Sequence, residues 1–376
     1  MKSILAVFAF DLGASFIDRH IKEILPGRTV AVGMYGPLPI ADLFPVSCPV
    51  FLLDRWTRRL SVRLARRACI PEDRLRDDAV ARFLRRHGVT AVLGEFLDQF
   101  LDFVPLLDRM GLPYVVQGHG IDLSAALRKP GMSERYLAYT SARAILTRCE
   151  FHRRRLIELG LPAEKIHSNP GGVDVPAEPP QRRSYANKRF LAIGVMVPKK
   201  GPIYLLESFR LAAAQDPDIS LDFVGGGPLF PAVRQFVEAC GLADRVRLHG
   251  FASEETKRRL LRECGVFVQH SLTNPETGDE EGLPAAIQEA MAHGMAVVST
   301  RHSGIPEAVV ENVTGLLVDE RNVQDMAKAF LQVTSSALDL GKAGHRRAAA
   351  EFATHHEQSR LSHWLFHRDP EGSTMP

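Results

Sequence analysis

Short apolar runs alternate with amphipathic stretches through the first half of the chain. The runs are bounded by Gly, Pro or polar residues, which is typical of β-strands. They are Ile4–Phe10, Val30–Met34, Val89–Gly94, Tyr114–Gln117 and Ala144–Thr147. Between them, Phe16–Leu25 and Asp77–His87 place apolar residues at helical spacing. Strands that alternate with covering helices predict an α/β domain with a parallel sheet.

The alternation stops near Asn169 and restarts at Arg189. Pro176, Pro179 and Pro180 lead into a polar stretch that ends at Lys188, as expected of a linker. Beyond it, the expected strands are Arg189–Gly194, Ile219–Val224, Val246–Leu248, Val266–His270 and Ala296–Thr300. The expected helices are Pro202–Gln215, Pro231–Cys240, Ser253–Cys264 and Pro284–His293.

A chain of 376 residues is too long for one ordinary core. The pattern predicts an N-terminal Rossmann-like domain at 1–175, a linker at 176–188 and a second such domain at 189–345. Residues 346–376 hold a last helix, Arg346–Phe366, whose apolar side chains need a surface to cover. This helix is expected to cross back to the N-terminal domain.

The overall composition excludes several functional classes. Lys and Arg exceed Asp and Glu by only three, so the chain lacks the charge of a nucleic-acid-binding protein. The five cysteines have no metal-ligand spacing and fit a reducing cytosol. The apolar start ends at Asp11 and resembles a strand more than a secretory signal, and no run reaches the ~18 apolar residues of a membrane span. We therefore expect a cytoplasmic protein with at most peripheral membrane contact.

Positive charge is concentrated in one stretch. Between Asp54 and Arg86 there are eleven arginines and five acidic residues. One interpretation is a solvated helical face. The other is a surface helix on anionic headgroups, with Trp56 and Leu60 in the interface.

The stretch from Gly278 to Gly294 is the most informative part of the sequence. Gly278 and Gly282 permit a tight loop, Pro284 suits a first helical position, and Gly294 can end the helix. The N-terminus of the short helix then points into the loop. Its free amides suit a phosphate or sugar hydroxyls.

Two carboxylates accompany this helix. Glu281 lies at its mouth and Glu289 lies eight residues further on. Carboxylates accept hydrogen bonds, so this pair could hold the hydroxyls of a ribose and a hexose. The alternative is a capping carboxylate at Glu281 and an ordinary helix residue at Glu289.

This arrangement resembles the glutamate-seven-glutamate signature of family 4 glycosyltransferases, which are retaining enzymes with the GT-B fold. In that fold, two Rossmann-like domains place parallel sheets across a cleft. Further similar segments are Ile193–Gly201 (a phosphate-binding turn), Val224–Pro228 (a glycine turn), Ser303–Glu307, Thr314–Val318, and Gln117–Asp122 (a histidine loop). The similarity is strong from Arg189 to Asp319 and looser before it.

The resemblance implies roles for the matching residues. Lys200 would neutralise the donor diphosphate, Glu289 would hold the ribose, and Glu281 would lie near the transferred sugar. Gly282, Leu283 and Pro284 would supply the turn beside it. From the other domain, His119 would face the sugar, and Gly13 with Ala14 would let the first loop approach the phosphates.

One position departs from the family pattern. An arginine usually follows the glycine of the phosphate-binding turn, where this chain has Val195. Either Lys199, Lys200 or an arginine from elsewhere compensates, or turnover is weak, or the protein is an inactive relative.

Two other motifs fail as sites. A dinucleotide fingerprint at Gly225–Gly227 would need a third glycine where Phe230 stands. His355, His356 and His363 have no acidic or cysteine partner at ligand spacing, which argues against a metal site.

The resemblance implies transfer of a hexose, with retention and without a metal or other cofactor, from a UDP- or GDP-sugar. The acceptor would be a saccharide or a lipid-linked saccharide, most like those of bacterial exopolysaccharide or colanic-acid-type enzymes. The alternatives are a sugar-nucleotide epimerase or phosphorylase on the same scaffold, and a catalytically silent sugar-nucleotide-binding protein.

Overall fold

The computed structural model describes residues 2–9, 12, 15–33, 48–53, 72–181 and 188–367. The chain forms two compact units, one of Met1–Thr147, Arg153–Asn169 and Gln358–Pro376, the other of Arg148–His152 and Pro170–Glu357. Within the described ranges, none of the helices has the length and apolar character required to span a bilayer.

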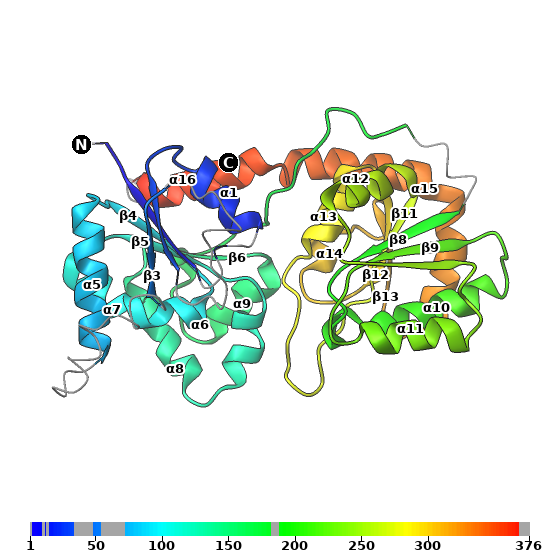
Figure 1. Cartoon of the computed structure of the whole chain (residues 1–376), viewed down its shortest axis with the longest axis horizontal. Coiled ribbons are helices and arrows are strands. Elements are labelled where there is room, and N and C mark those ends of the chain that lie inside the picture. Colours follow the sequence, from blue (N-terminus) through cyan, green and yellow to red (C-terminus); the bar gives the residue numbers. More distant parts are fainter. Residues whose placement is uncertain are drawn as a thin grey trace. The chain divides into compact units, whose positions relative to one another are not determined.

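The first unit is built on a sheet with helices around it (Figure 1). The sheet has seven parallel strands in the order β3-β2-β1-β4-β5-β6-β7. The strands are β1 (Leu5–Ala9), β2 (Thr29–Gly33), β3 (Val50–Leu52), β4 (Ala91–Glu95), β5 (Tyr114–Gln117), β6 (Ala144–Thr147) and β7 (Ile166–Ser168). The order reverses between β1 and β4, and ligands of such sheets bind beyond the carboxyl ends of the strands at this point.

Helices cover both faces of this sheet. They are α1 (Ser15–Glu23), α5 (Glu72–Arg86), α6 (Leu97–Phe100), α7 (Val104–Met110), α8 (Met132–Tyr136), α9 (Glu150–Glu158) and α16 (Thr354–Phe366). Alternate residues of β1 face opposite cores, with Phe8 among side chains of α5 to α7 and Val7 with those of α1. Leu361 and Leu365 of α16 join the Val7 core, so the predicted return of the last helix is confirmed.

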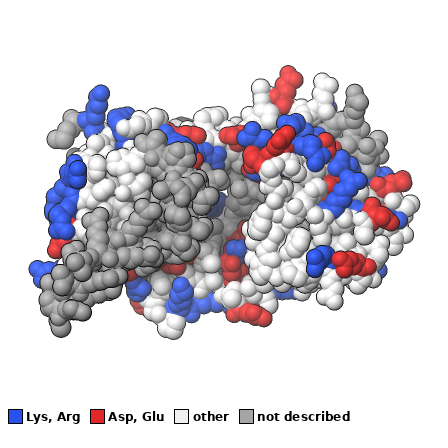
Figure 2. Space-filling model, viewed as in Figure 1, with Lys and Arg blue, Asp and Glu red and all other residues white. Residues whose placement is uncertain are grey.

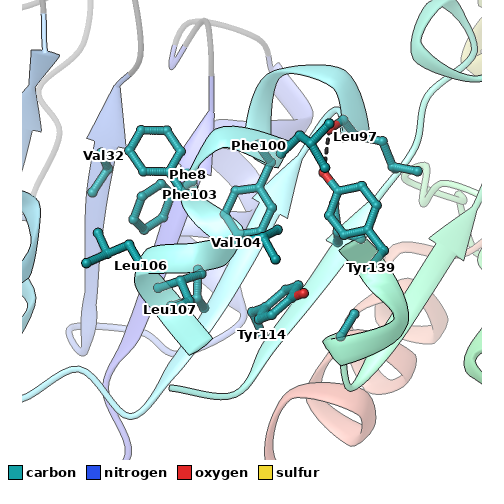
Figure 3. Packing of buried hydrophobic residues seen from close by; sticks show 14 of the residues in the cluster. Phe8, Val32, Leu97, Phe100, Phe103, Val104, Leu106, Leu107, Tyr114 and Tyr139 are labelled. Carbon is teal, nitrogen blue, oxygen red and sulfur yellow. Dashed lines mark hydrogen bonds between the residues drawn. The ribbon is translucent and has the colours of Figure 1, made fainter. Parts of the chain in front are cut away.

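The core beneath α6 and α7 is rich in aromatic residues (Figure 3). The Phe100 ring centroid lies 5.5 Å from that of Phe8 and 5.7 Å from that of Tyr114. Burial of each such side chain contributes about 1.5–3 kcal/mol. The Tyr139 hydroxyl donates to the Leu97 carbonyl, so the polar end of this ring is also satisfied.

The second unit is built on a six-stranded parallel sheet of order β10-β9-β8-β11-β12-β13. The strands are β8 (Arg189–Ile193), β9 (Ser220–Val224), β10 (Val246–Gly250), β11 (Val266–Val268), β12 (Ala296–Thr300) and β13 (Gly315–Val318). Counted within the unit, this is the 3-2-1-4-5-6 order of a Rossmann sheet.

Helices α10 (Pro202–Ala213), α11 (Phe230–Ala239) and α15 (Val323–Glu351) pack on one face of this sheet. Helices α12 (Glu254–Glu263), α13 (Ala285–Ala292) and α14 (Ile305–Ala308) lie on the other (Figure 1). On the face in Figure 2, basic and acidic side chains are interspersed over this unit.

The structure corrects the predicted end of the chain. The single helix Arg346–Phe366 is wrong, because α15 ends at Glu351 and α16 begins at Thr354. Between them Ala353 forms a bridge with Val173, which donates to the Phe352 carbonyl and accepts from the Thr354 amide. This pairing takes backbone groups that a continuous helix would use.

Candidate active site

The first part of the candidate site is the turn that follows β8. Gly201 has φ 47°, a left-handed conformation that ends the short 3₁₀ helix Pro198–Lys200, and Pro202 opens α10. A Cβ built on Gly194 would lie 3.6 Å from Lys200 Cδ, so the lysine side chain runs across this glycine. The predicted phosphate-binding turn therefore has Lys200 folded over it.

A second glycine turn, at the end of β9, packs directly on the first. Gly225 has φ 142°, and a Cβ there would lie 1.9 Å from the Gly194 carbonyl oxygen. The Met196 amide donates to the Gly226 carbonyl at 2.7 Å. Only glycine permits this approach, so the two turns form one rigid element at the carboxyl ends of adjacent parallel strands.

The loop from Gly278 into α13 has the predicted design with one correction. Gly278 and Gly294 both have positive φ, 70° and 68°. Pro284 does not start the helix as predicted; its ψ of 120° makes it the N-cap, and α13 begins at Ala285. The Gly282 carbonyl accepts from the Gly304 amide at 3.2 Å, which fixes the turn at Gly282 and Leu283.

Glu281 lies between two lysines. Lys200 Nζ donates to its Oε2 at 3.0 Å, and Lys199 Nζ lies 3.6 Å from its Oε1. Lys199 Nζ also donates to Asp279 Oδ1 at 3.0 Å. Since the Glu281 side chain is only 11 % exposed, the loop and the phosphate-binding turn are joined by a largely desolvated cluster of charges. The ion pair of Lys200 with Glu281 is thus a feature of the fold.

The charges in this cluster stabilise one another. Burial opposes ionisation of Glu281, but the ammonium groups of Lys200 and Lys199 outweigh it and lower the carboxyl pKa. Burial likewise opposes the charge of Lys199, yet Glu281 and Asp279 raise its pKa. The two lysine cations face the two carboxylates of Glu281 and Asp279, so each charge in this group of four side chains is compensated by an opposite one.

His302 holds the backbone of Glu281. Its Nε2 accepts from the Glu281 amide at 3.1 Å, and its Nδ1 lies 2.6 Å from Glu320 Oε1. The carboxylate can only accept, so the neutral ring carries its proton on Nδ1. The other oxygen of Glu320 accepts from the Thr273 amide at 3.0 Å. Glu320 and His302 together set the position of the loop.

We expect His302→Ala to loosen this loop without unfolding the unit. The unsatisfied Glu281 amide costs about 1–3 kcal/mol, and this corresponds to local opening that is about five- to hundredfold more frequent. Amide hydrogen exchange at Glu281 should accelerate by that factor, while the Val298 amide in β12 stays protected. Unchanged exchange at Glu281, relative to the exposed control His355→Ala, would contradict this role.

Glu289 lies in α13 and makes a different contact. Its Oε1 accepts from Lys257 Nζ, on α12, at 2.9 Å. The Glu289 side chain is 28 % exposed, so one face of the carboxylate reaches solvent. Its predicted contact with a ribose stays a prediction.

In the first unit, His119 follows β5 and points toward Glu95 at the end of β4. Its Nε2 lies 2.7 Å from Glu95 Oε2. Asp122 shapes the backbone of the same loop, because its Oδ1 accepts from the amides of His119 and Gly120, both at 2.9 Å. The predicted histidine loop is therefore built around a fixed ring.

Some predicted residues fall elsewhere. Gly13, Ala14 and the arginine-rich stretch around Trp56 lie outside the described residues, apart from the part in α5. Among the side chains that are described, no group of three or more His, Cys, Asp or Glu could hold a metal ion. Metal-independent chemistry stays a prediction.

The sequence prediction missed Glu95, His302 and Glu320. Each comes at or just after the carboxyl end of a strand, where parallel sheets gather functional side chains. This position was the available signal, and the predicted strand Val89–Gly94 stopped one residue before Glu95.

Comparison with known proteins agrees with this geometry. Residues 177–353 match the family model for glycosyl transferases group 1. The amylovoran biosynthesis glycosyltransferase AmsK of Erwinia amylovora is 34% identical over 190 residues, 50% of this chain and 46% of AmsK. WcaL of Escherichia coli K12, whose name assigns it to colanic acid biosynthesis, is 31% identical over 226 residues, 58% of this chain and 55% of WcaL. The chain thus spans about half the length of these curated relatives.

The structure is similar over nearly its whole length to HepE of Anabaena, solved in complex with UDP. The TM-score is 0.77 at 17% identity, over 96% of this chain and 98% of HepE. The fold is therefore that of the GT-B glycosyltransferases, with two parallel α/β sheets. More particularly, the residues that match the glycosyl transferases group 1 model make up most of the second unit.

Proposed function

We propose that this protein is a retaining glycosyltransferase that moves a hexose from a nucleoside-diphosphate sugar to a hydroxyl acceptor. The observation that carries the proposal is the cluster of Lys199, Lys200 and Glu281 beside two interlocked glycine turns, within a group 1 domain. Positive side chains and backbone amides at strand ends are suited to a diphosphate.

Each residue has a chemical task in this reaction. As the bond to the sugar breaks, negative charge grows on the leaving phosphate, and Lys200 stabilises the transition state more than the ground state. Glu281 accepts hydrogen bonds from the hydroxyls of the transferred sugar, and Glu289 accepts them from the ribose. The leaving phosphate takes the acceptor proton on the same face, so the configuration at the anomeric carbon is retained.

The donor is a UDP- or GDP-hexose. HepE, which shares the fold, was solved with UDP-glucose. Two relatives are named for amylovoran and colanic acid biosynthesis, which supports a saccharide or lipid-linked saccharide acceptor in bacterial polysaccharide or glycolipid assembly. We place the reaction in the cytoplasm, with the arginine-rich stretch as a peripheral contact to anionic lipid.

The test is incubation of the purified protein with UDP- and GDP-hexoses and candidate acceptors. A glycosylated product that keeps the donor's anomeric configuration is expected. A new sugar isomer formed without acceptor would indicate an epimerase. Donor binding by calorimetry without transfer or hydrolysis would indicate a silent binding protein, which the valine at position 195 makes a specific rival.

We expect Val195→Arg to strengthen donor binding. Val195 is 48% exposed, and its Cγ1 would lie 3.0 Å from a Cβ on Gly227, which places it on the glycine element. A new charge-assisted hydrogen bond there contributes about 1.5–3 kcal/mol, so the Kd for UDP or GDP should fall about tenfold or more. Calorimetry measures this, with Val313→Arg as an exposed control. Equal affinity in Val195→Arg and the unmodified protein would mean that Lys199 and Lys200 already saturate the site.

A further inference from the structure

We propose that Glu95 is a positioning residue for His119. Together with His20 it fixes the orientation of the His119 ring and keeps the ring proton on Nε2. This inference rests on the proposed function and on the role that the sequence resemblance implies for His119, which is to face the transferred sugar. The contacts from which it is argued all lie within the first unit.

The geometry is a carboxylate shared by two imidazole rings. Glu95 Oε1 lies 2.7 Å from His20 Nδ1, and Glu95 Oε2 lies 2.7 Å from His119 Nε2. The side chains of Glu95 and His20 are 0% exposed, and that of His119 is 11% exposed. Each oxygen of a fully buried carboxylate is thus occupied by one ring.

The state of the carboxylate determines where the ring protons lie. Burial opposes the charged form of Glu95, but the neighbouring charge of His20 and hydrogen bonds from both rings lower its pKa from 4.5 to about 2. At neutral pH Glu95 is therefore ionised and can only accept. The Nε2 of His119 must then carry a proton, and Nδ1 becomes the acceptor atom of the neutral ring.

Two aromatic side chains pack against the His119 ring and limit its rotation. The Phe16 ring centroid lies 4.7 Å from that of His119, and the Phe96 centroid lies 4.4 Å from it. Phe96 directly follows Glu95 and has φ 65°, an unfavourable conformation for a residue with a side chain. Such backbone strain is concentrated at functional sites, where the surrounding structure maintains it.

The consequence for the reaction is a defined acceptor atom. With Nε2–H held by Glu95, Nδ1 can accept a hydrogen bond from a sugar hydroxyl, and the carboxylate makes this nitrogen more basic. Among the described residues, the charged and titratable groups that lie close to His119 include Glu95 from β4, His20 from α1 and Asp122 from its own loop. Glu95 contacts the Nε2 nitrogen of the imidazole ring directly.

The test compares Glu95→Gln with Glu134→Gln, which removes one exposed carboxylate from the same unit. In Glu95→Gln we expect kcat to fall about ten- to hundredfold, with little change in the donor KM. Loss of the adjacent charge destabilises the imidazolium, so the acid limb of the pH profile should move to lower pH. Nitrogen-15 NMR should show His119 protonated at Nε2 in the unmodified protein and a tautomer mixture in Glu95→Gln.

An acid limb, a kcat and a His119 spectrum that all match the unmodified protein would overturn the inference. If Glu95→Gln does not fold, Glu95→Asp provides the second comparison, because it keeps the charge on a shorter arm. Its acid limb should stay near that of the unmodified protein, and a loss of the Nε2–H tautomer in Glu95→Asp would count against the proposal. Absence of hexose transfer by the unmodified protein would contradict the proposed function instead. The His119 tautomer seen by NMR would still decide whether Glu95 positions the ring.

Discussion

Glu281→Gln is expected to lower kcat for hexose transfer by about 10²- to 10³-fold, as loss of a preorganised electrostatic contact does in other active sites. Glutamine has the same shape as glutamate but no charge, and only one of its two terminal atoms can accept a hydrogen bond. The buried carboxylate between Lys199 and Lys200 would lose both its ion pairs. Initial-rate kinetics with a UDP- or GDP-hexose and acceptor measure the effect.

The affinity of Glu281→Gln for the nucleotide alone should not fall. Without the carboxylate, the two ammonium groups face a diphosphate with less competition, so UDP or GDP should bind at least as tightly to Glu281→Gln. The control is Glu276→Gln, which removes an exposed carboxylate from the same loop. Full activity in Glu281→Gln would remove Glu281 from the site.

Much of the fold follows from local hydrophobic pattern. The strands β5, β6 and β12 have the predicted bounds, because each is a fully buried run between turn residues. The strands β3, β7 and β13 were not predicted, since runs of three or four residues carry too little periodicity. Most of the long helix α15 was missed as well, since the predicted helix began only at Arg346, although the buried positions of α15 cover one face of the second sheet.

The candidate site was predictable only where the sequence holds a local motif. The glycines and the proline between Gly278 and Gly294 predict a turn followed by a helix, so Glu281 could be singled out from the sequence alone. Pairings over long sequence separations were out of reach. His302 and Glu320 reach the Glu281 loop from just beyond β12 and β13, and Glu95 meets His20 across 75 residues. Such contacts depend on the order of strands in the sheet, which the local pattern leaves open.

Lys200→Ala is expected to weaken binding of UDP or GDP about tenfold to a hundredfold, and to lower kcat/KM further. One charge-assisted contact to a phosphate contributes about 1.5–3 kcal/mol, and its strength increases as charge grows on the leaving group. Calorimetry and initial rates give the two numbers, with Lys328→Ala as control because Lys328 is exposed on α15 of the same unit.

The usual arginine is replaced by Val195 in this chain, and the variant Lys199→Ala tests whether Lys199 takes over its role or only anchors the loop. Lys199 is held by Asp279 and Glu281, whereas Lys200 contacts Glu281 alone among the carboxylates of the described residues. If Lys199 replaces the missing arginine, Lys199→Ala should lower kcat/KM as strongly as Lys200→Ala does. If Lys199 only anchors the loop, Lys199→Ala should leave nucleotide affinity within about threefold, and the Kd should rise chiefly in Lys200→Ala. Nucleotide affinity that is unchanged in both variants would show that the diphosphate binds elsewhere, because no desolvated cation can be removed from a phosphate site without loss.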